Sequence, residues 1–114
     1  MLPRFLDIEA SSLGPDSYPI EIAWSDAFGD IESYLINPVT VESWTDWDFY
    51  AEHEIHGISK AMCHVSGLHP QEICALMDQS IKAGEIIYAD GGRYDENWVG
   101  AQYNVLSEIK TVNI

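Results

Sequence analysis

Two carboxylates near the start of the chain have a spacing that could support metal-dependent chemistry. Asp7 and Glu9 lie in the segment FLDIEASSLG at residues 5–14, where apolar and acidic residues alternate. Residues two apart in a strand point to the same face, so the two carboxylates share one patch, while Leu6 and Ile8 point the opposite way. Neighbouring carboxylates either hold a proton more readily or require a cation, and oxygen ligands suit a hard divalent ion such as Mg²⁺. The alternative is a half-exposed strand that presents its acids to water, because an acid-x-acid triplet arises easily in an acidic chain.

The balance of charge limits how this chain can meet a nucleic acid. The 114 residues include 19 Asp and Glu against 5 Lys and Arg, which gives a net charge of −14. Twelve acids and no Lys or Arg fall between Arg4 and Lys60. A protein that coats a duplex through phosphate contacts is normally basic, so that role is disfavoured. The acidity is compatible with a site that meets phosphate through bound metal ions, which supply the positive charge.

Length and composition predict one globular domain that spans residues 1–114. The hydrophobic fraction of 46% argues against disorder. Cys63 and Cys74 are too few and too ordinary in spacing for a disulfide framework or a zinc site, and we expect reduced core thiols. No apolar signal segment precedes Asp7, and no stretch has the roughly 18 apolar residues of a membrane span. We therefore expect a cytoplasmic protein with no membrane partner.

The strand that carries the two carboxylates is expected to open an antiparallel sheet. Turn-forming residues at 11–18 follow it, and the next segment carries Ile20, Ile22 and Trp24 at alternate positions, which places them on one face. A second turn at 28–30 leads into a third strand. The expected strands are 5–10, 19–25 and 31–36, which together form a three-stranded meander.

The aromatic segment that follows, residues 41–54, does not predict a regular element. Its aromatic residues, which stand among five acids, are Trp44, Trp47, Phe49 and Tyr50. Such aromatics could stack on nucleobases. Anchoring of a loop or helix to the core is the favoured interpretation, since the surrounding acids disfavour contact with a nucleic-acid backbone.

Two helices and a strand are expected next. Ser59 is a suitable N-cap for a helix over 60–65, and Pro70 suits the first position of a longer helix. The apolar stripe of the longer helix is formed by Ile73, Leu76, Met77 and Ile81. Gly84 is placed to end this helix, and residues 86–88 then form a short apolar strand of the buried parallel type.

A glycine turn after this strand leads to a third carboxylate. Asp95 follows Asp90, Gly91 and Gly92, and it stands where it can cap a helix. The apolar positions of that helix are Trp98, Val105, Leu106 and Ile109. Capping alone would be enough to explain the presence of Asp95.

The order of elements predicts an α/β protein. A three-stranded antiparallel meander beside a strand reached by a helical crossover gives a mixed sheet with helices packed on it. No internal repeat or linker divides the chain. No two histidines have metal-ligand spacing, and we expect ordinary, partly exposed side chains at His53, His56, His64 and His69.

These motifs, in this order, resemble the DnaQ-like (DEDD) 3'-5' exonucleases, which have an RNase H-like fold. Asp7 and Glu9 match the first motif, Asp95 matches the second, and residues 55–58 (IHGI) are similar to the loop before the helical crossover. The resemblance covers the chain from residue 5 to about residue 106. It implies an RNase H-like mixed sheet that binds two Mg²⁺ or Mn²⁺ ions.

The resemblance also implies roles for individual residues. Asp7 would contact both ions, Glu9 would bind one ion and hold the attacking water, and Asp95 would act on the second ion. The implied reaction is phosphodiester hydrolysis by in-line displacement at the single-stranded 3' end of RNA or DNA. The residues implied to contact this substrate are Ala10, Ser11, Leu13 and His56.

Two departures from the family pattern affect the expected activity. Asp90 and Gly91 stand where family members usually have His-Asn, which affects contacts to the substrate. The third motif, a His or Tyr shortly before a final Asp, is absent, since no His follows His69 and residues 111–114 look like the beginning of a strand. We therefore expect a C-terminally truncated exonuclease domain with feeble or no hydrolysis. When catalytic groups act as a unit, the loss of one of them removes most of the activity.

Two other classes of function are compatible with the same residues. The first is a non-catalytic, acidic RNase H-like interaction module, whose uncovered sheet edge pairs with a second copy in a homodimer. The second is a small acidic protein that mimics nucleic acid, for which the strand with Asp7 and Glu9 would be a coincidence.

Overall fold

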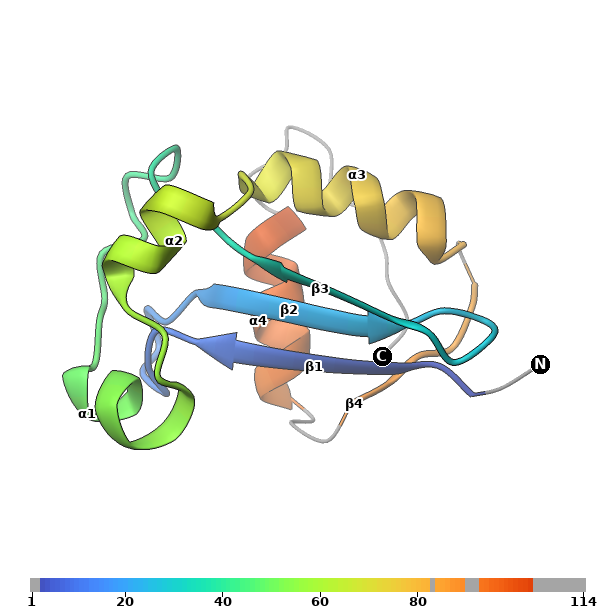
Figure 1. Cartoon of the computed structure of the whole chain (residues 1–114), viewed down its shortest axis with the longest axis horizontal. Helices are drawn as coiled ribbons and strands as arrows, with labels where there is room; N and C mark the ends of the chain where they lie inside the picture. Colours follow the sequence, from blue (N-terminus) through green and yellow to red (C-terminus); the bar gives the residue numbers. More distant parts are fainter. Residues whose placement is uncertain (1–2, 83, 90–92, 104–114) are drawn as a thin grey trace.

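The sheet expected from the sequence is present as four strands in the order β3-β2-β1-β4 (Figure 1). The computed structural model describes residues 3–82, 84–89 and 93–103. The strands are β1 (Phe5–Ala10), β2 (Pro19–Ser25), β3 (Ile31–Leu35) and β4 (Tyr88–Ala89). β2 runs antiparallel to both β1 and β3, and β4 runs parallel to β1. The α/β class and the mixed sheet, an antiparallel meander with one parallel strand, are confirmed.

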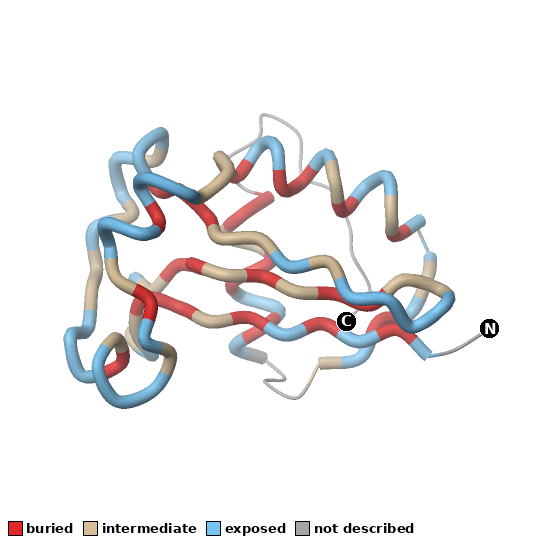
Figure 2. Tube along the Cα trace, viewed as in Figure 1, coloured by how far each residue is buried: buried red, intermediate tan, exposed pale blue. Residues whose placement is uncertain are grey.

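Alternation along the strands divides the sheet into two unlike faces. Leu6, Ile8 and Trp24 are buried on one face, within the main core. Figure 2 shows buried and less buried positions alternating along β1 and β2. In the segment that leads into β4, Ile87 is fully buried but Tyr88 is 55% exposed. The prediction of a strand buried on both faces is therefore wrong, because no described element covers the second face there.

The helices are α1 (Phe49–Ala51), the π-helical turn η1 (Glu52–His56), α2 (Lys60–Ser66), α3 (Pro70–Ser80) and α4 (Arg93–Tyr103). α2 and α3 begin where the sequence predicts, whereas α1 and η1 were not predicted and α4 begins before Asp95. The Ser59 side chain accepts a hydrogen bond from Met62 N at 3.1 Å, which confirms its capping role. α3 stops at Ser80 and not at Gly84, because Ile81 adopts an extended conformation and buries its side chain in the core. Within the described ranges, no helix is long and apolar enough to cross a membrane.

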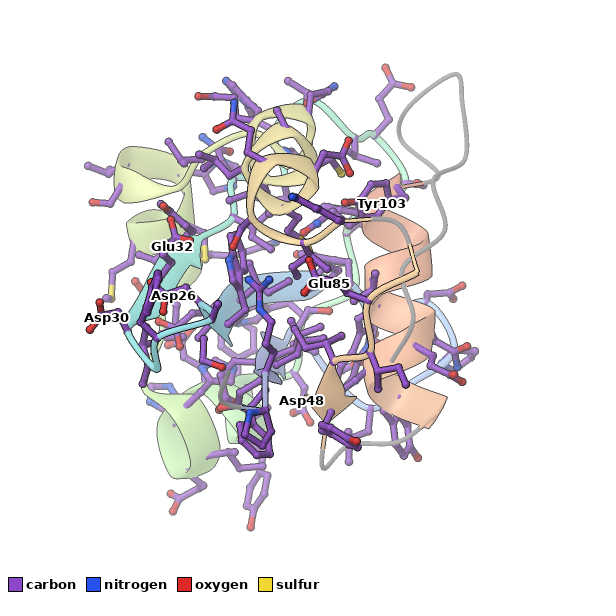
Figure 3. The ribbon with its side chains drawn as sticks, turned by 90° about the vertical axis from the view of Figure 1, so that its right-hand side faces the viewer. Asp26, Asp30, Glu32, Asp48, Glu85 and Tyr103 are labelled. Atoms are coloured by element: carbon purple, nitrogen blue, oxygen red, sulfur yellow. The ribbon has the colours of Figure 1, made fainter. Side chains whose placement is uncertain are left out.

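The helices cover the two faces of the sheet unequally. α4 crosses behind the strands, and α3 contributes Ile73, Cys74 and Met77 to the core (Figure 1). α1, η1 and α2 lie on the opposite side, at the end of the sheet where β1 finishes (Figure 1 and Figure 3). Over the rest of that face the described part of the chain has no helix.

A second apolar cluster packs α2 and the segments that flank α1 and η1 against the sheet. Its buried members are Tyr18, Ile20, Ile58 and Cys63. Trp44 stacks on Tyr18 with ring centroids 5.2 Å apart, and Trp47 packs against the same cluster. The anchoring interpretation is therefore confirmed for both tryptophans. It is wrong for Phe49 and Tyr50, which are 66% and 67% exposed.

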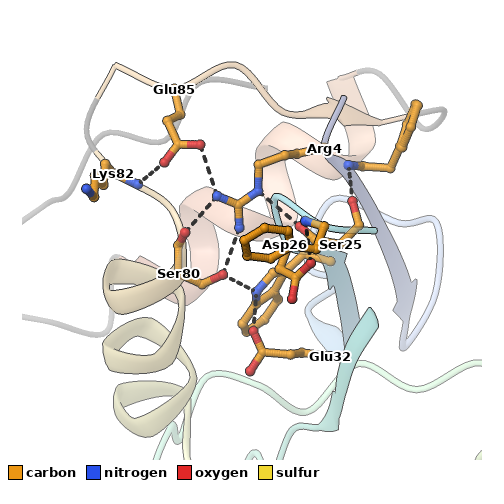
Figure 4. A network of polar contacts seen from close by, with 10 residues as sticks. Arg4, Ser25, Asp26, Glu32, Ser80, Lys82 and Glu85 are labelled. Atoms are coloured by element: carbon orange, nitrogen blue, oxygen red, sulfur yellow. Dashed lines mark hydrogen bonds and ion pairs between the residues drawn. The ribbon is translucent and has the colours of Figure 1, made fainter. Parts of the chain in front are cut away.

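A buried arginine joins the start of β1 to the end of α3 (Figure 4). Arg4 is 6% exposed and donates hydrogen bonds to the backbone carbonyls of Ser25 at 3.0 Å and Ser80 at 2.7 Å. It also donates to Ser80 Oγ at 2.7 Å and forms an ion pair with Glu85 at 2.9 Å. The carbonyl of Arg4 accepts a hydrogen bond from Tyr88 N, which ties β4 to β1. This positive charge is thus compensated entirely by groups of the same chain.

Candidate functional site

β1 presents two acidic side chains on the face opposite the main core. Asp7 is exposed and Glu9 is half-buried, while Leu6 and Ile8 point into the core. The register of β1 against β2 places Glu21 directly opposite Glu9. Directly paired residues on neighbouring strands share a face, so Glu21 joins the two expected carboxylates. The shared patch expected for Asp7 and Glu9 is confirmed.

Asp95 lies on α4, the helix that packs against the core face of the sheet. It lies in the first turn of α4 and is 3% exposed. Because α4 begins at Arg93, Asp95 is a helical residue, and the prediction that it caps the helix is wrong. A carboxylate in the first turn interacts favourably with the helix dipole. The other residues predicted around this motif, Asp90, Gly91, Val105, Leu106 and Ile109, lie outside the described residues.

Burial and the charges of several acids act on the pKa of Glu9. Burial raises the pKa of Glu9, and the negative charges of Asp7, Glu21 and Asp95 raise it further. Asp95 is far from Glu9 in the sequence, so the fold brings the two acidic segments into one electrostatic field. Among the described side chains, no lysine or arginine forms an ion pair with Asp7, Glu9 or Glu21. A cation supplied from outside would therefore reduce the repulsion at this patch.

The donors at this patch suit a hard divalent cation. Carboxylate oxygens are the ligands that Mg²⁺ and Mn²⁺ select, so the donor chemistry fits these ions. Within the described ranges, no three His, Cys, Asp or Glu side chains are grouped closely enough to hold a metal ion. Asp7, Glu9 and Asp95 therefore do not form a ligand set in the described structure.

The end of β1 and the turn after it contain three of the residues expected to contact a substrate. Ser11 is buried, and its side-chain oxygen accepts a hydrogen bond from Tyr18 N at 3.1 Å. Its carbonyl accepts another from Asp48 N at 2.9 Å, which fixes the start of α1 beside the end of β1. Ser11 therefore has a structural role in this turn. Ala10 is buried as well, whereas Leu13 is 65% exposed and accessible to a ligand.

His56 lies where η1 ends. Gly57, with a φ of 67°, reverses the chain directly after it. His56 Nδ1 accepts a hydrogen bond from Ile58 N at 2.9 Å, and the ring lies edge-on to Trp47 with centroids 6.2 Å apart. Burial lowers the pKa of His56, so the imidazole is neutral near pH 7. Nε2 is buried, and the charge of Glu52 and the backbone of Ala10 oppose the effect of burial on the pKa of the ring.

A groove on the open face of the sheet adjoins Asp7. It has a volume of about 620 Å³ and is lined by residues of all four strands, among them Phe5, Asp7, Ala23, Ile31 and Tyr88. Phe5 and Tyr88 are neighbours, with ring centroids 6.0 Å apart. The sequence patterns considered above did not predict this groove. The signal was present, since Phe5 and Ala23 occupy the alternate positions that face away from the core.

Comparisons with known proteins do not assign a family. No protein-family model matches the chain, and a search of curated proteins finds no match either. The function proposed below therefore depends on the residues, their resemblance to family motifs and their geometry.

Proposed function

We propose that this chain is a metal-dependent 3'-5' exonuclease-like protein with an RNase H-like fold, of the DnaQ-like (DEDD) class. One observation carries the proposal: β1 presents Asp7 and Glu9 on one face beside Glu21, where burial and the charges of Asp7, Glu21 and Asp95 raise the pKa of Glu9. The order of elements supports the proposal. The first motif lies in β1, at the start of the meander; a helical crossover then leads to the parallel strand β4, and the second motif lies in the next helix, α4. A carboxylate patch in an acidic protein can meet a phosphodiester through bound cations.

The roles of the residues follow from this proposal. Asp7, Glu9 and Asp95 would hold Mg²⁺ or Mn²⁺. Two such ions, when bound, neutralise the substrate phosphate and stabilise the attacking and leaving oxygens of the displacement. Pairing with β2 holds Asp7 and Glu9 on one face, where Glu9 would accept a hydrogen bond from the attacking water. His56 would support the substrate site as a neutral imidazole packed edge-on to Trp47.

The proposed substrate is the single-stranded 3' end of an RNA or DNA strand. Leu13, exposed in the turn after β1, would contact the terminal nucleotide. The sequence has no histidine after His69 that could serve as the general base of the family. We therefore expect this polypeptide to recognise a 3' end and to shorten it slowly at most.

Recognition of a free 3' end that depends on Mn²⁺ tests the proposal. The probe is a single-stranded oligonucleotide with a 5' fluorophore, prepared as RNA and as DNA, and compared with the same strand carrying a 3'-phosphate. We expect Mn²⁺ to promote binding of the free 3'-hydroxyl form, and Asp7→Asn to abolish this effect. Asp16→Asn is the matched control, because it removes an exposed acid from a turn. Binding that ignores both Mn²⁺ and Asp7→Asn would overturn the proposal.

An acidic, non-catalytic interaction module with the same fold is the second candidate, and the uncovered groove beside Asp7 favours it. For such a module, neither Mn²⁺ nor Asp7→Asn would alter oligonucleotide binding. If its partner is a second copy of the chain, sedimentation at micromolar protein concentration would show a dimer.

A further inference from the structure

The groove on the open face of the sheet is uncovered by the described part of the chain. α4 and α3 pack on the core side, and α1, η1 and α2 cover only one end of the open face (Figure 1 and Figure 3). The groove presents Phe5, Ile31 and Tyr88, which are 57%, 74% and 55% exposed. Large apolar side chains exposed together around a groove mark an interaction surface.

The position of the groove favours a helix over an added strand. A strand binds at a sheet edge through backbone hydrogen bonds, whereas this groove lies on the face and is lined by all four strands. The exposed face of a sheet is normally covered by a helix whose apolar stripe packs on it. A volume of about 620 Å³ takes side chains from successive turns of one helix, which project at every third or fourth residue.

Charge determines which kind of helix the surface accepts. Asp7 lines the groove, and Glu9 and Glu21 continue the same face beyond it. The chain carries a net charge of −14, so a second copy would be repelled from this face. A lysine or arginine beside the apolar stripe would pair with these carboxylates and accelerate association.

We propose that the open face of the sheet is a docking surface for a cationic amphipathic helix of another polypeptide. The apolar stripe of that helix would fill the groove over Phe5, Ile31 and Tyr88, and a Lys or Arg would lie against Asp7. This inference goes beyond the proposed nuclease activity, in which none of the three apolar residues has a role.

A fluorescent model peptide tests the proposal on the full chain. The probe is a helix of about five turns that contains only leucine and lysine, with the leucines in one stripe. One control peptide has the same composition in scrambled order, and a second keeps the leucine stripe but replaces every lysine by glutamate. Anisotropy is measured at about 0.15 M salt, where long-range attraction to the acidic surface is screened. We expect both control peptides to bind at least about tenfold more weakly than the probe. A tenfold increase in Kd is the effect expected from the loss of one buried side-chain contact.

Variants of the protein locate the contact. Ile31→Lys and Tyr88→Lys each remove an exposed apolar side chain from the groove, and each should weaken probe binding by about tenfold or more. Val65→Lys is the matched control, because Val65 is 86% exposed on α2 and does not line the groove. The melting temperature of each variant shows that it is folded.

Three results would overturn the proposal. The first is equal weakening by Val65→Lys, and the second is equally tight binding of either control peptide. The third is a dimer of the unliganded protein that Ile31→Lys dissociates, which would make a second copy the occupant. Oligonucleotide binding that depends on Mn²⁺ should persist in Ile31→Lys, so failure of the docking proposal and failure of the nuclease proposal are distinguishable.

Discussion

At the start of β1 one positive charge is buried, whereas at its end several negative charges gather. Arg4 precedes β1 and is held by two backbone carbonyls, a hydroxyl and the carboxylate of Glu85. Glu9, near the end of the strand, lies close to other acids, and no described lysine or arginine pairs with it. The same strand therefore carries one charge that the fold compensates and a group of charges that it does not.

The two ends of β1 differ in whether the chain itself supplies the partners of a charged side chain. A buried charge that receives all its partners from the chain is explained by the fold, and removing it is costly. A carboxylate whose pKa is raised by burial and by neighbouring acids, as at Glu9, is typical of a site completed by something external, such as a metal ion or a basic side chain of a partner. The two ends of β1 should accordingly respond in opposite ways to mutation, to pH and to added cations.

The largest effect is expected at the Arg4 end. Arg4→Gln should lower the free energy of unfolding by about 3 kcal/mol, because the carbonyls of Ser25 and Ser80 lose their donor in a buried environment. Urea unfolding near pH 7 measures this loss. Lys82→Gln is the control, since it removes an equal charge from an exposed position and should change stability by less than about 0.5 kcal/mol. Equal losses in the two variants would contradict the structural role of Arg4.

Divalent cations should act at the other end. At a concentration of Mn²⁺ about 100 times its Kd, the ion should stabilise the fold by about 2.7 kcal/mol and raise the melting temperature by roughly 10 °C. Asp7→Asn should remove this increment, and Asp16→Asn should preserve it. Thermal unfolding followed by fluorescence provides the measurement. An increment of the same size in Asp7→Asn would show that Mn²⁺ binds elsewhere.

Glu85 should show the pH dependence of a compensated acid. The backbone N–H of Lys82 and the side chain of Arg4 hold the pKa of Glu85 below its usual value of 4.5. The contribution of Glu85 to the free energy of unfolding is therefore complete above about pH 4.5 and is lost as the pH falls through its folded-state pKa. Glu85→Gln should lower the free energy of unfolding by less than about 1 kcal/mol near pH 7, because the carboxylate is partly exposed. In strong acid the substitution should leave it unchanged. Urea titrations from about pH 7 to about pH 3 test this; a difference that grows toward low pH would contradict it.

Glu9 should show the opposite pH dependence with a smaller effect. Its pKa is raised above 4.5, so it stabilises the fold relative to the unfolded chain in acid, and this contribution is lost as the pH rises through the folded-state pKa. Glu9→Gln should therefore stabilise the metal-free protein by about 0.5 kcal/mol near pH 7, since it removes a like-charge pair with Glu21. The gain should vanish below about pH 4.5. A loss of stability at pH 7 would mean that Glu9 has a compensating partner.

Local patterns predicted much of the fold because they depend on short-range geometry. The alternation of apolar residues along β1 and β2 placed Leu6 and Ile22 in the core and Asp7 on the other face. Ser59 and Pro70 marked helix starts, since capping and a fixed φ act within one turn.

The remaining features depend on tertiary contacts that no local pattern encodes. α3 ends early because Ile81 packs in the core. The burial of Arg4 depends on acceptors from β2 and α3 that are distant in the sequence. The influence of Asp95 on the pKa of Glu9 could be expected only from the family motifs, because spacing along the chain does not measure a distance in space.

The shortness of β4 has a mechanical consequence for the candidate site. β4 pairs with β1 only at Phe5 and Leu6, so within the described residues the backbone from Asp7 to Ala10 has a ladder partner on one side alone. Amide hydrogens on the unpaired side should exchange with solvent faster than those bonded to β2. The segment of β1 that carries Asp7 and Glu9 is therefore less constrained than the rest of the sheet. Small shifts of these two carboxylates toward an incoming ion or cationic side chain would leave the core undisturbed.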